Sequence, residues 1–276
     1  KADSPSITKA KSNVAIVIKV GIVNGEIYNH LSLKSESYGY TTNGDSEVIL
    51  SLHKGKANAG EHAKWISQLD GMFAFAILDT KSNKLILGRD RAGKKPLYYF
   101  KEADSMVFAS ELNTLSNCVN KLRVDEMEIS SYIRNGFFYH EKTPFQDVYE
   151  VSPGSVFTIN LNDLTIQRNS FFDILNYYKK HKINEFDLAL RLLDEGLHKS
   201  VKDRLLSLDR EVGAFLSGGI DSSLIVAVAS EYVDKLKTFT VKFDGSFDES
   251  KLAKLTAEKY GTDHTEILIS MDLKDD

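Results

Sequence analysis

Two different hydrophobic patterns follow one another along the chain. Up to about residue 170, short runs of β-branched and aromatic residues alternate with polar turns, as in 73–78 and 84–88 around the turn 79–83. The same pattern predicts further strands at 14–18, 20–23, 97–100, 106–109 and 155–159, and helices at 46–52 and 125–135. Short strands joined by tight turns are typical of antiparallel sheets, so we expect an α+β domain here.

After an irregular stretch at 171–183, helices and strands alternate. Apolar residues recur at helical spacing from Phe186 to Val201, which predicts an amphipathic helix. The next predicted elements are a buried strand at 212–216, a buried helix at 224–229, a strand at 238–243, a helix at 251–260 that ends at Gly261, and a strand at 265–269. This order predicts a parallel sheet with a nucleotide at the carboxyl ends of its strands. Two or three strands make a poor open sheet, so this second domain is expected to be incomplete.

The most informative segment, residues 217–223, reads Ser-Gly-Gly-Ile-Asp-Ser-Ser and lies between the predicted strand and helix. Glycines let the backbone approach an anion, and the free N–H groups and dipole at a helix start favour negative charge. Ser217 and Ser222 add hydroxyl groups, and Asp221 suits Mg²⁺ or an N–H donor. An ordinary capped turn is the alternative, but the complete motif in this context favours a nucleotide pyrophosphate site.

Two upstream segments have a structural and a functional interpretation. Asn24-Gly25 is either a simple turn or an oxyanion hole made from an amide side chain and a backbone N–H. Asp45 and Ser46 precede a predicted helix, where either residue is a suitable N-cap. The functional alternative is that Asp45 holds the α-ammonium group of an amino-acid substrate.

Residues 88–94 match the spacing of a Walker phosphate loop, but the residues that follow exclude that interpretation. Lys95 cannot supply the hydroxyl that binds Mg²⁺, and Pro96 interrupts the helix that would have to continue. The Arg-Asp-Arg run at 89–91 instead predicts a partly buried ion-pair network that orders a turn.

Composition narrows the function classes. The 276 residues carry a net charge of −4 without a basic cluster, which gives no indication of nucleic-acid binding. One cysteine, Cys118, excludes an internal disulfide framework and a thiolate zinc site, and is consistent with a cytoplasmic location. No apolar run is long enough to cross a membrane.

Taken together, these segments resemble one family, the glutamine-hydrolysing asparagine synthetases of the B type. The resemblance extends from about Val20 and includes residues 24–29, 44–47, 70–76, 89–91, 95–99, 108–111, 136–154 and 217–223. It implies an N-terminal-nucleophile glutaminase domain with an αββα sandwich at 1–172. It also implies the start of an α/β ATP pyrophosphatase domain at 184–276. Members of the family often form dimers, so a homodimer is one expectation.

The resemblance implies a reaction in two halves. A cysteine at the mature N-terminus attacks glutamine, and the ammonia released travels through a tunnel to an aspartate that ATP has adenylylated. In the glutaminase, Asn24 and Gly25 match the oxyanion hole, and Asn24, Glu26 and Asp45 match the glutamine contacts. In the second domain, the positions that bind pyrophosphate and Mg²⁺ in the family correspond to Ser217, Gly218, Gly219, Asp221 and Ser222. The positions that line the adenine and ribose pocket correspond to Leu216 and Val241.

The chain departs from the family at both ends. It begins Lys1-Ala2-Asp3-Ser4 without the nucleophilic cysteine, and a later Gly-Glu-Gly loop is absent. Cys118 lies in mid-chain, where a structural or surface thiol is expected. Truncation explains both absences most simply. The alternatives are a related amidotransferase acting on another carboxylate, or a degenerate relative without catalytic activity.

Overall fold

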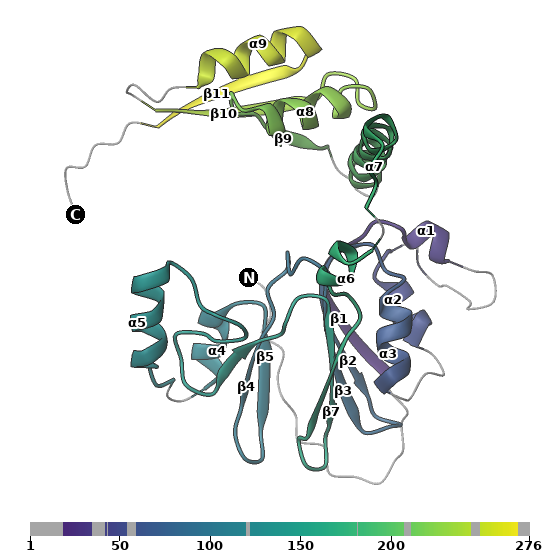
Figure 1. The fold of residues 1–276 in the computed structure, drawn as a ribbon. Coiled ribbons are helices and arrows are strands. Elements are labelled where there is room, and N and C mark those ends of the chain that lie inside the picture. Colours follow the sequence, from purple (N-terminus) through teal and green to yellow (C-terminus); the bar gives the residue numbers. More distant parts are fainter. Residues whose placement is uncertain are drawn as a thin grey trace. The chain divides into compact units, whose positions relative to one another are not determined.

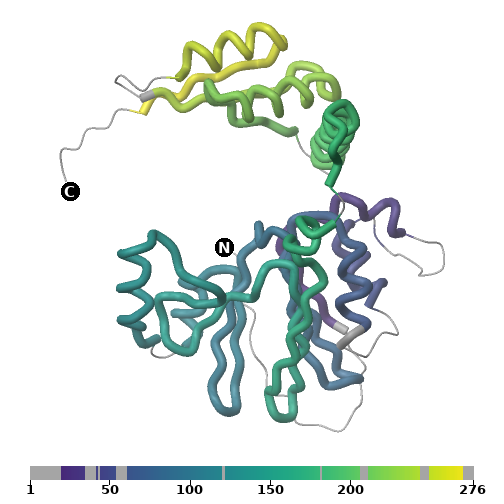
Figure 2. Tube along the Cα trace, in the orientation of Figure 1, coloured from purple at the N-terminus to yellow at the C-terminus, as the bar shows by residue number. Residues whose placement is uncertain are grey.

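The computed structural model describes residues 19–34, 42, 44–53, 59–119, 122–180, 182–206, 211–243 and 249–269. These residues form two compact units (Figures 1 and 2). Unit 1 takes the described residues up to Gly25 and from Lys34 to Asp173, and unit 2 takes Glu26–Leu33 and the described residues from Ile174 onward. The strand predicted at 14–18 lies outside the described residues.

Unit 1 contains a five-stranded sheet in the order β1-β2-β3-β7-β8. Its strands are β1 (Lys19–Ile27), β2 (Gly71–Asp79), β3 (Lys84–Arg89), β7 (Ser155–Asn160) and β8 (Ile166–Ser170). Antiparallel pairing joins β2 to β3, β3 to β7 and β7 to β8. The predicted hairpin of β2 and β3 is therefore confirmed, while β8 was not predicted.

The second sheet of unit 1 has three antiparallel strands in the order β5-β4-β6. They are β4 (Tyr98–Lys101), β5 (Met106–Ala109) and β6 (Val148–Glu150). The predicted pair of β4 and β5 is confirmed, and β6 joins it from a distant part of the chain.

Helices cover the outer faces of the two sheets, so unit 1 has the four layers α, β, β and α that Figure 1 shows. On the five-stranded sheet lie α2 (Glu47–His53) and α3 (Ala59–Ile66), and on the other side lie α4 (Leu112–Cys118) and α5 (Glu126–Asn135). Asp125 caps α5 by accepting the N–H groups of Met127 and Glu128, and Gly136 ends it in a left-handed conformation. The αββα expectation is confirmed.

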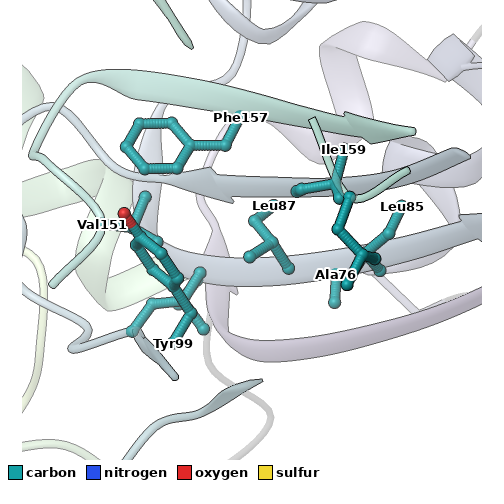
Figure 3. Packing of buried hydrophobic residues seen from close by; sticks show 10 residues of the cluster. Ala76, Leu85, Leu87, Tyr99, Val151, Phe157 and Ile159 are labelled. Atoms are coloured by element: carbon teal, nitrogen blue, oxygen red, sulfur yellow. The ribbon is translucent and has the colours of Figure 1, made fainter. Parts of the chain in front are cut away.

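Strand β2 shows how the sequence builds these layers. Phe73 and Phe75 stack on one another, and Phe75 stacks on Trp65 of α3. The alternate residues Ala74 and Ala76 belong to a different buried cluster, with Leu87 of the neighbouring strand β3 and Tyr99 of the other sheet. Large residues on one face and small residues on the other therefore let β2 pack against a helix layer and a second sheet at once. Figure 3 shows the cluster on the small-residue face.

Unit 2 contains a parallel sheet in the order β11-β10-β9, as predicted. Its elements after the short α1 (His30–Leu33) are α6 (Leu175–Tyr178), α7 (Phe186–Leu206), β9 (Gly213–Phe215), α8 (Ile220–Ala229), β10 (Lys237–Phe243), α9 (Ser250–Tyr260) and β11 (Asp263–Ile269). Gly261 ends α9 with a φ of 64°, which confirms the predicted stop. The single turn α6 lies in the stretch that was predicted to be irregular.

The predicted burial of β9 and α8 is wrong for one side of each element. Phe215 is 81% exposed, and Leu224 and Ile225, within the helix predicted to be buried, are also exposed. Among the described strands β9 lies at the sheet edge, and one face packs in the core of unit 2. That core contains Val201, Leu216, Val226, Val228, Ala229, Leu236, Ala253 and Ala257.

Candidate functional site

Gly25 fixes the backbone at the first candidate site. It lies near the end of β1 with a φ of 133°, a region that residues with a side chain rarely adopt. A Cβ at this position would lie 1.9 Å from the carbonyl oxygen of Met72 and 2.8 Å from Cα of Phe73. Only glycine allows β1 to approach β2 so closely, so the Asn24-Gly25 pair has one fixed backbone conformation.

The side chain of Asn24 reaches a residue of the other sheet. Its Nδ2 donates a hydrogen bond of 3.1 Å to Oγ of Ser110, which directly follows β5. Both residues line a cavity of about 230 Å³, together with small and apolar residues of β2 and β5. The structure thus places an amide N–H group at a concave surface, which is the arrangement that an oxyanion hole requires.

Asp45 and Ser46 form the start of α2. The Oγ atom of Ser46 donates to Oδ1 of Asp45 at 3.1 Å, and the carbonyl of Asp45 accepts the N–H of Val48. Glu47 accepts hydrogen bonds from the N–H and the hydroxyl of Thr42. Asp45 is half-buried and does not line the cavity beside Asn24. Glu26, also half-buried, belongs to the segment grouped with unit 2.

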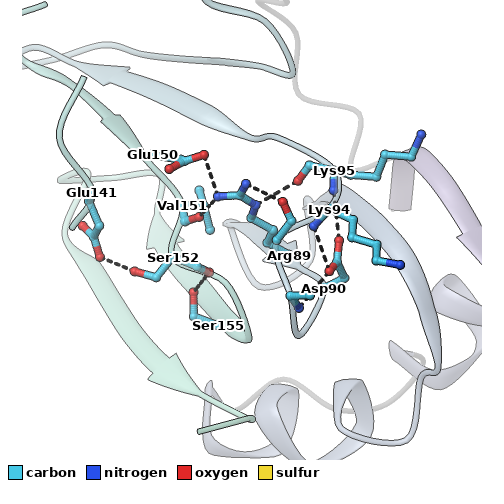
Figure 4. A network of polar contacts seen from close by, with 11 residues as sticks. Arg89, Asp90, Lys94, Lys95, Glu141, Glu150, Val151, Ser152 and Ser155 are labelled. Carbon is cyan, nitrogen blue, oxygen red and sulfur yellow. Dashed lines mark hydrogen bonds and ion pairs between the residues drawn. The ribbon is translucent and has the colours of Figure 1, made fainter. Parts of the chain in front are cut away.

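Arg89 is the centre of a buried polar network (Figure 4). Its guanidinium donates to the carbonyls of Gly93, Lys95 and Val151 at 2.7–2.8 Å and forms an ion pair of 2.9 Å with Glu150. The side chain is 5% exposed. The predicted network is confirmed, although the carboxylate partner of Arg89 is Glu150 rather than a residue of the Arg-Asp-Arg run.

Asp90 orders the turn that follows Arg89. Its carboxylate accepts the backbone N–H groups of Phe73, Ala92, Lys94 and Lys95 at 3.0–3.2 Å. A carboxylate occupies the N–H groups that a Walker loop would present to a phosphate. The structure therefore supports the rejection of a Walker site at 88–94.

In unit 2, residues 217–222 form a compact turn between β9 and α8. Oγ of Ser222 lies 2.8 Å from Oγ of Ser217 and accepts the N–H of Ser217, while Oγ of Ser217 accepts the N–H of Gly219. Gly219 is the N-cap of α8 and has no side-chain cap. Asp221 is exposed in the first turn of the helix. Two hydroxyls, a helix start and an exposed carboxylate thus meet at the carboxyl end of β9.

Gly218 is required by a second helix. A Cβ on it would lie 3.0 Å from Cβ of both Glu249 and Leu252, at the N-terminus of α9. The loop therefore packs against the start of α9 as well as forming the start of α8. Both helix dipoles place partial positive charge beside it, which favours an anion.

Leu216 directly follows β9 and Val241 lies on the neighbouring strand β10, and their side chains are on opposite sides of the sheet. Leu216 is buried in the core of unit 2 and donates its N–H to the carbonyl of Phe239. In the register of β9 and β10, Phe215 pairs with Phe239, so Val241 is on the face of Phe215 rather than that of Leu216. A nucleotide pocket could use the side chain of Val241, whereas Leu216 offers its backbone.

Two other observations concern the described residues. Cys118, the last residue of α4, is exposed. Within the part of the chain that the structure describes, no group of three His, Cys, Asp or Glu side chains could hold a metal ion, and no helix is long and apolar enough to cross a membrane.

Sequence reasoning missed Ser110 and Glu150 as members of these sites. Ser110 was noted only as part of the segment 108–111, and its partner Asn24 is far away in the sequence. A polar residue at the end of an apolar strand was the available signal, since strand ends carry functional side chains in many folds.

Two different protein families match the two parts of the chain. Residues 5–171 match the family model of the glutamine amidotransferase domain, and residues 192–273 match that of asparagine synthase. Asparagine synthetase [glutamine-hydrolyzing] 1 of Bacillus subtilis is 37% identical over 258 residues, which are 90% of this chain and 39% of that protein. A putative asparagine synthetase [glutamine-hydrolyzing] 2 of Methanocaldococcus jannaschii is 32% identical over 255 residues, with 88% and 47% covered.

A less expected relative is amidase chry2 of Gibberella zeae, which is 30% identical over 275 residues, covering 88% of this chain and 38% of that protein. Among solved structures, glutamine phosphoribosylpyrophosphate amidotransferase of B. subtilis aligns with 92% of this chain and 46% of its own, at 17% identity and a TM-score of 0.38. The chain spans less than half the length of each of these relatives.

Proposed function

Because the chain belongs to the family of glutamine amidotransferases that carry an asparagine synthase domain, we propose that the complete protein makes asparagine from aspartate, glutamine and ATP. In this proposal unit 1 hydrolyses glutamine and unit 2 activates the aspartate side chain as an acyl adenylate. Ammonia then displaces AMP from the adenylate, so the products are asparagine, glutamate, AMP and pyrophosphate.

The role of unit 1 in the proposal is to stabilise a tetrahedral intermediate. The nucleophile is the N-terminal cysteine that members of the family carry, and its attack places negative charge on the former amide oxygen. The N–H groups of the Asn24 side chain and the Gly25 backbone are the proposed donors to this oxygen. The fixed conformation of Gly25 and the cavity beside Asn24 support that assignment. Glu26 and Asp45 are the proposed carboxylates for the α-ammonium group of glutamine.

The role of unit 2 is to hold ATP through its phosphates. Ser217, Gly218, Gly219 and Ser222 are proposed to bind the pyrophosphate, with Leu216 and Val241 beside the adenine and ribose. Asp221 is the proposed ligand of Mg²⁺, because an exposed carboxylate beside two hydroxyls has the oxygen donors that this ion prefers. The ion would neutralise charge on the phosphates.

One observation carries the proposal. The turn Ser217–Ser222 lies between β9 and α8 of a parallel sheet, at the carboxyl end of the strand and the N-terminus of the helix. It follows, in the same chain, a segment that matches a glutamine amidotransferase domain. A candidate nucleotide-phosphate site in the same chain as a glutamine amidotransferase domain supports ATP-dependent amide synthesis.

The test uses the protein expressed from its complete natural coding sequence. We expect AMP and asparagine in equal amounts when ATP, aspartate and glutamine are all present. Asp221→Asn should lower AMP formation strongly, whereas Asp234→Asn, an exposed substitution beyond the end of α8, should not. AMP formation that does not depend on aspartate would contradict asparagine synthesis, and no AMP with any carboxylate would contradict the ligase assignment.

A second candidate function is amidation of a different carboxylate. It is favoured by the similarity to amidase chry2, a relative that is not named as an asparagine synthetase. Incubation with glutamine, ATP and a panel of amino acids and organic acids separates the two candidates. Faster AMP formation with another carboxylate than with aspartate would select the second.

A further inference from the structure

We propose that Ser110 is a positioning residue of the glutaminase site, which holds the Asn24 amide in the orientation that stabilises the oxyanion. The inference rests on the proposed glutaminase function of unit 1. It adds a residue from the second sheet to a site that otherwise depends on the Asn24-Gly25 segment of β1.

The hydrogen bond between the two residues leaves one donor of Asn24 available. An asparagine amide nitrogen carries two hydrogens in one plane, and the 3.1 Å bond to Oγ of Ser110 uses one of them. When the first hydrogen is held, the plane of the Asn24 amide is held as well, and the second hydrogen then has a fixed direction. Both residues line the same cavity, so the second hydrogen belongs to a side chain at the surface where a substrate would bind.

Ser110 is well placed for this role because two packed elements hold it. It directly follows β5, which pairs with β4 at Tyr98–Ala109, and it precedes α4. Leu115 of α4 is fully buried in a cluster with Phe100 and Val148. On the other side of the bond, Gly25 packs so closely against β2 that a Cβ on it would lie 1.9 Å from the carbonyl oxygen of Met72. The Asn24 side chain is therefore held between two rigid layers.

Pre-positioning matters for an oxyanion hole because its donors must point at the charge before the charge develops. Loss of one such donor typically lowers kcat by about 10²–10³-fold. Removal of the Ser110 hydroxyl leaves the Asn24 donor present but free to rotate, so the expected loss is smaller, about tenfold or more in kcat. KM for glutamine should change by less than about threefold, because the oxyanion exists only after attack.

The experiment measures glutamine hydrolysis by the complete protein and five variants. Ser110→Ala should show the loss in kcat, and Ser110→Thr, which keeps the hydroxyl, should retain most of the wild-type rate. Asn24→Ala should be slower than Ser110→Ala, and the double variant Asn24→Ala with Ser110→Ala should be no slower than Asn24→Ala within about twofold. Ser116→Ala is the matched control, since Ser116 is exposed on α4 and its hydroxyl donates to the carbonyl of Asn113 in the same helix.

Two further measurements separate positioning from a structural role. AMP formation with ammonium in place of glutamine should be unchanged in Ser110→Ala, because that reaction bypasses the glutaminase. Thermal unfolding should also be close to wild type. If Ser110→Ala does not fold, Ser110→Cys replaces it, since a thiol fills similar space but is a weak hydrogen-bonding group.

The possible results are distinct. An active wild-type protein with unchanged kcat in Ser110→Ala overturns the inference alone. Additive losses in the double variant overturn it as well, because Ser110 would then act independently of Asn24. A complete wild-type protein that hydrolyses no glutamine overturns the proposed function and the inference together.

Discussion

Gly25 is the residue at which unit 1 tolerates the least change. Its φ of 133° and the 1.9 Å approach of a Cβ to Met72 O mean that Gly25→Ala must displace β1 from β2. We expect this substitution to lower the free energy of unfolding by at least about 2 kcal/mol, measured by urea denaturation. Gly44→Ala is the control, because the nearest described atom to a Cβ there is Thr42 Oγ1, at an ordinary 3.5 Å. Equal stability of the two variants would contradict the proposed strain.

Arg89 is the residue whose charge the fold depends on most. Arg89→Met leaves Glu150 without its partner and removes three hydrogen bonds to carbonyl groups, so we expect a loss of about 3–5 kcal/mol in unfolding free energy. Arg91→Met should cost less than about 1 kcal/mol, since Arg91 is half-exposed and its carboxylate partner Asp70 is 3.8 Å away. Urea denaturation of both variants checks the contrast, and a small loss at Arg89 would show that the network is not needed for stability.

The start of α9 limits which residues the turn 217–222 can contain. Gly218→Ala places a methyl group 3.0 Å from Glu249 and Leu252 and must move the loop or the helix. Among the described residues, a Cβ on Gly219 meets the Ser217 hydroxyl at 3.3 Å. We therefore expect Gly218→Ala to weaken ATP binding about tenfold or more, and Gly219→Ala to weaken it less, as measured by calorimetric titration of the complete protein. The reverse order would contradict the packing of the loop on α9.

The sequence predicted the longer elements and missed the short or polar ones for physical reasons. Apolar residues recur at regular spacing in the hairpin of β2 and β3, in α7, and in the run from β9 to β11. The sequence therefore indicated whether each of these elements is a helix or a strand. Strand β8 lies at a sheet edge and has the mostly polar sequence Ile-Gln-Arg-Asn-Ser, so it lacks the apolar pattern of a buried strand. Helix α4 contains Asn, Thr and Ser, which have a low helix propensity. Strand β6 has three residues and forms only because β4 is already present beside it.

The candidate sites were predictable where they are local and not where they are assembled from distant segments. The turn 217–222 carries its own glycines, hydroxyls and helix start, so its geometry follows from its sequence. Asn24 and Gly25 had two interpretations from their local sequence, and the oxyanion hole was assigned to them through the family resemblance. The bond from Asn24 to Ser110 depends on two sheets coming together, and the division of Leu216 and Val241 between two faces depends on strand register. Neither arrangement has a local signature.

The stability of unit 1 as a whole should fall in alkali. Burial raises the pKa of Tyr99, which lies in the cluster between the two sheets, and the nearby Arg168 opposes this only partly. Tyr98 has a raised pKa for the same reason. The unfolded chain therefore loses these protons first, so the stability that is present below the usual tyrosine pKa of about 10 is lost as the pH rises through the folded-state values.

Thermal unfolding between pH 8 and pH 11 measures this effect. Tyr99→Phe should flatten the decline above about pH 10, although at neutral pH it costs about 1 kcal/mol through the lost bond from Arg168. Tyr139→Phe is the control, because the Tyr139 side chain is exposed. An unchanged alkaline decline in Tyr99→Phe would contradict the assignment.

The strand order of unit 1 has a consequence for how the protein is made. The central strand β3 pairs on one side with its neighbour in sequence, and on the other with β7, so that Leu85 meets Ile159. On a ribosome the β2–β3 hairpin emerges long before β7 is synthesised, and one of its long edges stays open meanwhile. Pairing across such a separation is slow, and open apolar edges associate with other chains. We therefore expect newly made unit 1 to depend on chaperones until β7 leaves the exit tunnel.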